Sequence, residues 1–284
     1  MAKIKVTCDS TCDLTKDLYE KYNIDVIPLG VTLGEDFRYD SVNVTAQELY
    51  DYVDRTGQLP KTSAISVGDY LDRFSPYVQQ GYDILHISLS SELSSCYQNA
   101  CLAARELGHV HVVDSRNLST GSGHLAILAV ELADADYKAG EIADALNDMK
   151  DRVDVSFVLQ TLDYLHKGGR CSGVAAFGAN VLKLRPEIEV KAGQMHVGKK
   201  FRGDMERSIL AYVRSRLQGR SNIQHDRIFV THSGVPGELV EKVKSLVREL
   251  QPFDRVIETV AGSTISSHCG PACLGLAFFR TGNS

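Results

Sequence analysis

Hydroxyl side chains gather at one point of the chain, where the hydrophobic pattern changes. Ser90, Ser91, Ser94 and Ser95 lie between the apolar run at 84–87 and a segment whose apolar residues recur every three or four positions. The first pattern is typical of a buried strand and the second of a helix. A helix start has unpaired backbone N–H groups and partial positive charge, so hydroxyls beside it suit a small anion. One serine would only cap the helix, but four are more than one cap requires.

Two further sets of side chains could take part in chemistry. His232 and His268 lie in glycine-containing segments that we expect to be loops beside strands, where either could act as the base for a nucleophilic Ser94. The segment 166–220 carries 12 Lys and Arg against 4 Asp and Glu, although the whole chain has a net charge of −5. Such a segment can bind nucleic acid, attract phosphate-bearing ligands or dock a protein.

Several common motifs are absent from the sequence. There is no Walker A motif and no G-x-S-x-G, and the G-x-G-x-x-A match at 121–126 does not directly follow an expected strand. The seven cysteines form no C-x-x-C pair, which favours reduced, buried thiols over zinc or disulfides. No apolar run approaches the roughly 18 residues of a membrane span. We therefore expect a cytoplasmic protein with no cofactor, no metal and no membrane span.

The elements that must position these residues alternate between strand and helix. Strands expected at 3–8, 84–87, 109–113 and 155–159 are separated by amphipathic segments, which predicts a largely parallel sheet with helices on both faces. Beyond 160, a strand–turn–strand pattern at 188–197 indicates a mixed sheet. The sequence therefore predicts an α/β fold of two domains packed across a cleft. The N-terminal domain, 1–160, has three layers, and the α/β domain 161–284 has the mixed sheet.

Five motifs occur in an order that resembles the DegV family and cover essentially the whole chain. The resemblance implies two α/β domains with a fatty acid buried between or within them. It also implies a lipid-binding protein and not an enzyme, because several members serve as the binding subunit of bacterial fatty-acid kinase. The motifs are KTSAIS at 61–66, SLSSELSSCYQNA at 88–100, VVDSRNLSTGSG at 112–123, LDYLHKGGRCSG at 162–173 and AGSTISSHCGPACLGLAF at 261–278.

The resemblance also implies roles for individual residues. Thr62 and Ser94 match the threonine and serine that hold the acyl carboxylate. Arg170, Arg202 and His268 match positions associated with the head group or its phosphorylated form. These five side chains are the expected ligand-binding residues, and none is expected to be catalytic.

Two positions depart from the family pattern. The chain has Ser95-Cys96 where the family commonly has Gly-Thr or Gly-Ser, and Ile65 where it commonly has proline. A side chain at 95 is expected to narrow the head-group site or to shift its amides, which affects the identity of the ligand more than its class. We expect a protein that binds a long-chain fatty acid and presents its carboxylate to a partner fatty-acid kinase, without binding nucleic acid. A serine hydrolase of lipid esters and a nucleic-acid-binding regulator are the alternatives.

Overall fold

A four-stranded parallel sheet forms the centre of the N-terminal half in the computed structural model, which describes residues 3–171 and 184–282. Its strand order is β2-β1-β6-β7, and all three neighbouring pairs are parallel. The central strands are buried on both faces, as expected for a sheet covered on both sides, although one face of β1 carries the polar residues Lys5, Thr7 and Asp9. The strands are β1 (Lys3–Asp9), β2 (Asp25–Ile27), β6 (Tyr82–Ser88) and β7 (Val110–Asp114).

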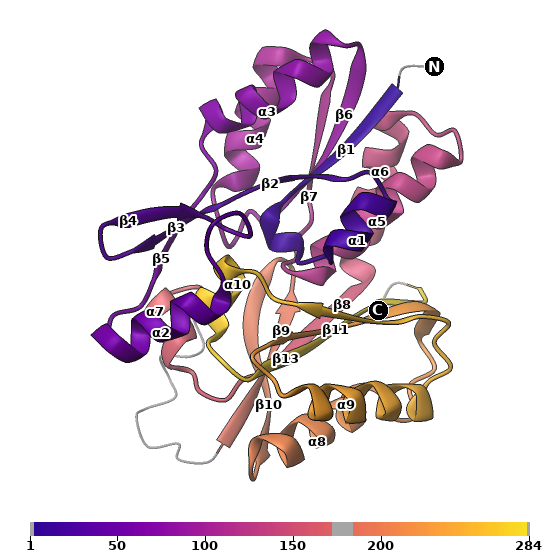
Figure 1. Ribbon diagram of the computed structural model, residues 1–284. Coiled ribbons are helices and arrows are strands. Elements are labelled where there is room, and N and C mark those ends of the chain that lie inside the picture. The colour runs from indigo at the N-terminus through magenta and orange to yellow at the C-terminus, as the bar shows by residue number, and fades with distance from the viewer. Residues whose placement is uncertain (1–2, 172–183, 283–284) are drawn as a thin grey trace.

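Helices cover both faces of this sheet, as the alternating pattern predicted. In Figure 1, α3 and α4 lie on one side of β1, β6 and β7, while α1, α5 and α6 lie on the other. A capping box at Ser66 and Asp69 begins α3, because each side chain accepts from the backbone N–H of the other. The helices are α1 (Lys16–Lys21), α3 (Val67–Gln79), α4 (Cys96–Leu107), α5 (Thr120–Asp134) and α6 (Ala139–Met149).

A six-stranded mixed sheet forms the other half, in the order β10-β9-β8-β13-β11-β12. Only β11 and β12 pair in parallel, and the expected hairpin turn at Ala192-Gly193 joins β9 to β10. Helices α8 (Met205–Leu217) and α9 (Gly237–Leu250) cover one face (Figure 1). The strands are β8 (Val153–Val158), β9 (Leu184–Lys191), β10 (Gln194–Arg202), β11 (Ile223–Ser233), β12 (Val256–Val260) and β13 (Cys273–Arg280).

Short elements fill the space between the halves. A three-stranded antiparallel sheet, β4-β3-β5, packs beside α10. We expected a loop around His268, but residues 263–269 form α10, and residues 61–63 form β5. The elements are β3 (Gly30–Leu33), β4 (Asp36–Tyr39), β5 (Lys61–Ser63), α2 (Ala46–Thr56), α7 (Asp163–Gly168) and α10 (Ser263–Cys269), with one-turn 3-10 helices at Ser10–Cys12 and Lys150–Arg152.

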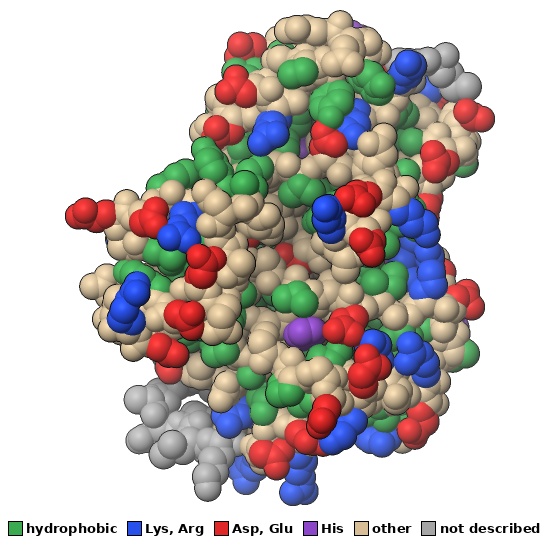
Figure 2. Space-filling view, viewed as in Figure 1, with side chains coloured by type: hydrophobic (Ala, Val, Ile, Leu, Met, Phe, Trp, Pro, Cys, Tyr) green, Lys and Arg blue, Asp and Glu red, His purple; other side chains and the backbone are tan. Residues whose placement is uncertain are grey.

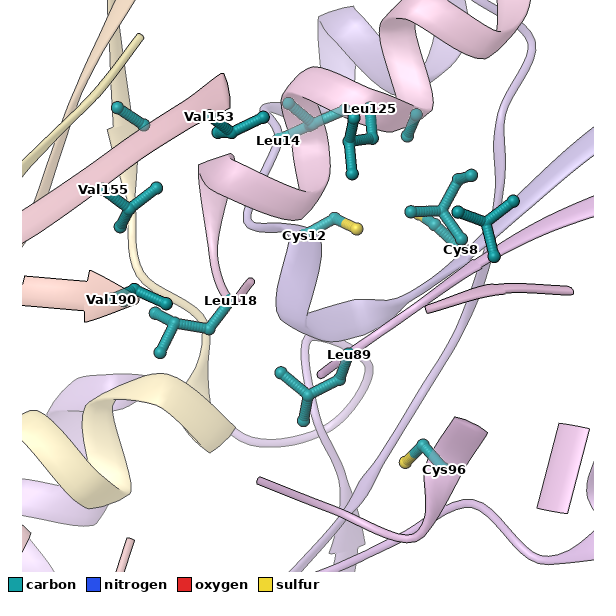
Figure 3. Packing of buried hydrophobic residues seen from close by; sticks show 14 of the residues in the cluster. Cys8, Cys12, Leu14, Leu89, Cys96, Leu118, Leu125, Val153, Val155 and Val190 are labelled. Carbon is teal, nitrogen blue, oxygen red and sulfur yellow. The ribbon is translucent and has the colours of Figure 1, made fainter. Parts of the chain in front are cut away.

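One hydrophobic core runs from the parallel sheet to the mixed sheet. Figure 3 shows side chains of this cluster from the first half, such as Cys8 and Leu125, and from β8 of the mixed sheet, such as Val153 and Val155. Helix α5 contacts both sheets and lies between them. The division into domains 1–160 and 161–284 stays a prediction, and β8, which precedes residue 160, pairs with β9 and β13 of the mixed sheet.

Candidate functional site

A pocket opens between the two halves and collects four of the five expected binding residues. Its empty volume is about 590 Å³, counted out to its open mouth. Much of its wall is apolar and includes Leu29, Leu89, Leu93, Leu118, Phe157 and Ile265. Its polar side chains are Thr62, Ser63, Ser94, Arg170, Thr264 and His268. We call this the outer pocket.

Thr62 and His268 meet in the outer pocket from opposite ends of the chain. Thr62 Oγ1, on β5, lies 2.9 Å from His268 Nε2, on α10. A Cβ atom at Gly168 would lie 2.5 Å from His268 Nδ1, so the glycine keeps the space beside that nitrogen open. Burial, with a smaller contribution from the Arg170 charge, lowers the pKa of His268 to about 4. The imidazole is therefore neutral at neutral pH.

The Thr62–His268 bond restricts which atom can donate to a ligand. A neutral imidazole has one N–H group and the threonine has one O–H group, so their mutual bond uses one of two protons. His268 Nδ1 has no hydrogen-bond partner among the described residues. If Thr62 donates to a ligand, it must accept from Nε2–H, and Nδ1 is then a bare acceptor. If Nδ1–H donates instead, Thr62 donates to Nε2.

The four serines of the central loop have different roles. Ser90 Oγ donates to the Gly193 carbonyl of the β9–β10 hairpin at 2.8 Å, and Ser91 Oγ donates to Asp114 at 2.6 Å. Ser95 is exposed. Only Ser94 of the four lines the outer pocket. Three of the four therefore serve the loop's structure or face solvent, and the anion site expected from the group reduces to one hydroxyl.

Ser94 also lies two residues before α4, just ahead of the N-cap residue Ser95. The backbone N–H of Cys96 donates to Ser94 Oγ at 3.3 Å, and the Ser94 hydroxyl points to Cys96 Sγ at 3.2 Å. Burial raises the pKa of the Cys96 thiol to about 12, so its sulfur is a neutral, weak acceptor. The Ser94 proton is therefore held only weakly and can turn to a better acceptor in the pocket.

A buried carboxylate behind the pocket fixes the loop that carries Ser94. Asp9 Oδ2 accepts from Ser88 Oγ at 2.8 Å and from the Leu89 N–H at 2.7 Å. Its Oδ1 accepts from the Tyr70 hydroxyl at 2.6 Å and lies 3.1 Å from His86 Nε2. Burial alone would raise the pKa of Asp9, but these donors, His86 foremost, hold it below its ordinary value. Asp9 is therefore an ionised anchor between β1, β6 and α3.

Two further carboxylates hold α10, the helix that carries His268. Asp13 accepts from the Gly262 N–H at 2.9 Å, and Asp40 accepts from the Ser263 N–H at 2.7 Å. Both aspartates come from the N-terminal half and bind amides that the helix leaves unpaired. Burial raises the pKa of Asp13 to about 8, despite hydrogen bonds from Ser119 and Gly262 that lower it. The serine-rich segment thus forms a helix instead of the expected loop because distant side chains cap it.

The two arginines have different positions. Arg170 lines the outer pocket, is exposed, and donates from Nη1 to the Gly168 carbonyl at 2.6 Å. Arg202 is exposed at the end of β10 and is not among the residues that line the outer pocket. The last two residues of the motif at 162–173 lie outside the described residues.

A second cavity, which we call the inner pocket, adjoins the outer pocket. The two share Leu118, Phe157, Ile265 and Cys269, and the inner pocket has an empty volume of about 400 Å³. Its hydroxyls pair with protein groups: Thr120 Oγ1 lies 2.7 Å from Thr231 Oγ1, which lies 2.9 Å from Thr259 Oγ1. Paired in this way, they leave the lumen largely apolar.

Sequence reasoning overlooked Thr264 and the inner pocket. Thr264 lies in the motif at 261–278, four residues before His268, and that helical spacing was the available signal. His232 lies in β11, not in a loop, and lines the inner pocket with Nε2 3.5 Å from Glu258. Among the described residues, no group of three or more His, Cys, Asp or Glu side chains could hold a metal, and no helix could cross a membrane.

Comparison with known proteins shows similarity along the whole chain. The model of the DegV family, described as uncharacterised, matches residues 3–281. A Thermotoga maritima protein named fatty acid-binding protein is 31% identical over 280 residues, with 96% of each chain covered. The structure of a fatty-acid-binding DegV family protein from Thermus thermophilus matches with a TM-score of 0.86 and 29% identity, covering 98% of this chain and 99% of that one. The Fatty Acid Kinase (Fak) B3 protein of Streptococcus pneumoniae, solved with linoleic acid, is similar in fold alone, with a TM-score of 0.82, 19% identity and coverage of 98% and 99%.

Proposed function

Because this chain belongs to the DegV family, we propose that it binds a long-chain fatty acid and presents the carboxylate to a partner kinase for acyl-phosphate formation. The carboxylate lies at Thr62 and Ser94, and the acyl chain extends from the outer into the inner pocket. The observation that carries this proposal is the pair of adjoining, largely apolar pockets, of which the outer one has hydroxyl donors in its wall.

The apolar walls of the pockets and the hydroxyl groups bind different parts of the ligand, the acyl chain and the carboxylate respectively. Burial of an acyl chain contributes about 0.8 kcal/mol per methylene, so roughly fifteen methylenes give an upper bound of about 12 kcal/mol before ordering costs. A buried carboxylate needs hydrogen bonds to offset a desolvation cost of several kcal/mol. Ser94 can turn its proton from Cys96 to the ligand, and Thr62 can donate while it accepts from His268 Nε2–H.

Phosphorylation would change the charge that this end of the pocket must hold. An acyl phosphate carries more negative charge than a carboxylate, which favours the protonated imidazole of His268. The imidazolium has a second N–H, so Thr62 and Nδ1 can then donate together. Arg170 lies at the mouth, where a phosphoryl group would enter. The sequence has no phosphate-cradling loop, so ATP has to come with a partner, whose docking we assign to the region of Arg202.

The alternatives receive less support from the site. A nucleophilic Ser94 needs a base within hydrogen-bond reach, but His268 is bonded to Thr62 and Ser94 to Cys96. For nucleic-acid binding, the basic segment is partly neutralised, because Arg216 pairs with Glu189 at 2.7 Å and with Glu187 at 3.2 Å. Charges of both signs are interspersed over the face shown in Figure 2. These contacts therefore favour the lipid-binding hypothesis over both alternatives.

The test compares lipid content with kinase product in the same preparations. Purified protein should carry about one fatty acid per chain by lipid extraction and mass spectrometry. Arg170→Ala, Arg202→Ala and His268→Ala should keep that lipid, because the acyl chain supplies most of the affinity, but should form several-fold less acyl phosphate with a fatty-acid kinase and ATP. Arg105→Ala, an exposed arginine on α4, is the matched control.

Each result bears on a different part of the proposal. Protein that carries no fatty acid and takes none up from solution contradicts binding itself. If the three variants lose lipid and product in parallel, these residues only retain the ligand, and presentation to the kinase has to be assigned elsewhere.

A further inference from the structure

Thr264 has a buried hydroxyl without a partner. Its side chain lines the outer pocket, the residue is 4% exposed, and Oγ1 makes no hydrogen bond to any described residue. An unsatisfied buried donor is unfavourable, and helical threonines usually avoid it by bonding to a carbonyl of the preceding turn.

The other hydroxyl and thiol groups of α10 do have carbonyl partners, within the helix or outside it. Ser267 Oγ donates to the Ser263 carbonyl at 2.7 Å, and Cys269 Sγ donates to the Ile265 carbonyl at 2.8 Å. Ser263 Oγ and Ser266 Oγ also donate to carbonyls. Thr264 therefore carries the one hydroxyl of α10 that has no hydrogen-bond partner among the described residues, and it lines the outer pocket together with His268.

The position of Thr264 relates it to the first part of a bound acyl chain. It precedes His268 by four residues, so both lie on one face of α10 about one turn, 5.4 Å, apart. Thr264 is buried, whereas Thr62 and Ser94 are half-buried. Its hydroxyl is thus set back from the two hydroxyls that hold the carboxylate, beside the apolar wall along which the first carbons would run.

We propose that Thr264 binds an oxygen substituent on one of the first carbons of the acyl chain, so that the pocket prefers a hydroxy fatty acid to an unsubstituted one. This inference rests on the proposed function, because it assumes a carboxylate at Thr62 and Ser94. A hydroxyl on the ligand can donate to Thr264 Oγ1 or accept from it, whereas a methylene leaves it unpaired.

A competition experiment tests this preference. Full-length protein is incubated with an equimolar excess of palmitate and β-hydroxypalmitate, each enantiomer separately, and the bound acids are quantified by mass spectrometry after gel filtration. The parent should favour one β-hydroxy enantiomer about fivefold, the effect of one net hydrogen bond. Thr264→Val, which keeps the shape and removes the hydroxyl, should bring the ratio to about one, and Thr264→Ser should keep it above one.

Two controls isolate the site. Thr11 Oγ1 is also buried without a partner but lines neither pocket, so Thr11→Val should leave the ratio unchanged. ω-Hydroxypalmitate places the same group at the far end of the chain and should gain nothing over palmitate.

The outcomes separate this inference from the proposed function. Palmitate binding with a parent ratio of one overturns the inference and leaves fatty-acid binding standing. An equal loss of both acids in Thr264→Val also overturns it, because Thr264 would then be a ligand of the carboxylate. If neither acid binds, fatty-acid binding itself fails.

Discussion

The outer and inner pockets are both lined by hydroxyl side chains but leave them in opposite states. In the inner pocket the hydroxyls of Thr120 and Thr231 bond to each other, and Ser156 and Ser233 also have protein partners. In the outer pocket Thr264 has none, and Ser94 is held only by Cys96. Hydroxyls that satisfy one another leave an apolar lumen, whereas open hydroxyls need a ligand. Whether a hydroxyl already has a protein partner, and not the type of residue that carries it, therefore decides whether that hydroxyl is available to a ligand.

The largest effect is expected from removal of the anchor behind the outer pocket. Asp9→Ala leaves four donors without an acceptor in a buried region, so the free energy of unfolding should fall by about 3 to 5 kcal/mol. Chemical denaturation measures this. The matched control is Asp83→Ala, whose partner His109 is exposed, and it should cost at most about 1 kcal/mol. If Asp9→Ala and Asp83→Ala lowered the free energy of unfolding equally, the buried hydrogen bonds of Asp9 would contribute no more than an exposed pair.

The second effect is a pH dependence of the stability, and it concerns Asp13, which together with Asp40 binds the first amides of α10. The pKa of Asp13 is about 8 in the folded protein but near 4 in an unfolded chain. Between pH 4 and pH 8, Asp13 is therefore protonated in the folded protein and ionised in the unfolded chain. Stability from this group is present below pH 4 and falls as the pH rises to 8. Each pKa unit is worth about 1.4 kcal/mol. Asp13→Asn should therefore lose less stability than the parent between pH 5 and pH 8 in thermal unfolding, and equal slopes would contradict this.

The third prediction concerns the open hydroxyls directly. Thr62→Ala and Ser94→Ala each remove a hydrogen bond to a charged carboxylate, worth roughly 1.5 to 3 kcal/mol. Bound fatty acid should exchange about ten- to a hundredfold more readily, as measured by transfer to lipid vesicles. Ser95→Ala, which alters the exposed neighbour of Ser94, should exchange like the parent. If bound fatty acid exchanged at the parent rate in both the Thr62 and the Ser94 variant, the carboxylate would have to bind at other residues.

The smallest effect is expected in the inner pocket, and it should be of the opposite kind. Thr231→Val leaves Thr120 and Thr259 without their shared partner and should lower the free energy of unfolding by about 1 to 3 kcal/mol. Lipid content should stay at the parent level, since a bound acyl chain does not need that hydroxyl. If Thr231→Val kept its stability but lost lipid, the hydroxyls of the inner pocket would serve ligand binding as well, which contradicts the distinction between the two pockets.

Local patterns in the sequence predicted much of the fold. The turn within 188–197 and the strand–helix junction around Ser94 are both encoded by neighbouring residues, and both are present. The parallel and mixed sheets follow from the same periodicities.

The parts that sequence reasoning missed depend on distant partners. Helix α10 is rich in serine and begins where Asp13 and Asp40 bind its amides, more than 200 residues away in sequence. The pairing of Asp9 with His86 spans 77 positions. Thr264 could not be distinguished from the other hydroxyls of α10, because only the folded structure leaves its oxygen without a partner.

The contact between Thr62 and His268 joins residues 206 positions apart, and this has a consequence for synthesis of the protein. A ribosome adds about 5 to 20 residues per second, so for many seconds a nascent chain has Thr62 in place but no α10 to meet it. A chain that stops before α10 lacks one wall of the outer pocket, and a ligand that needs both walls cannot stabilise it. If the proposed fatty acid contacts both walls, it can bind only chains that extend through α10, and it then stabilises only those completed chains against unfolding.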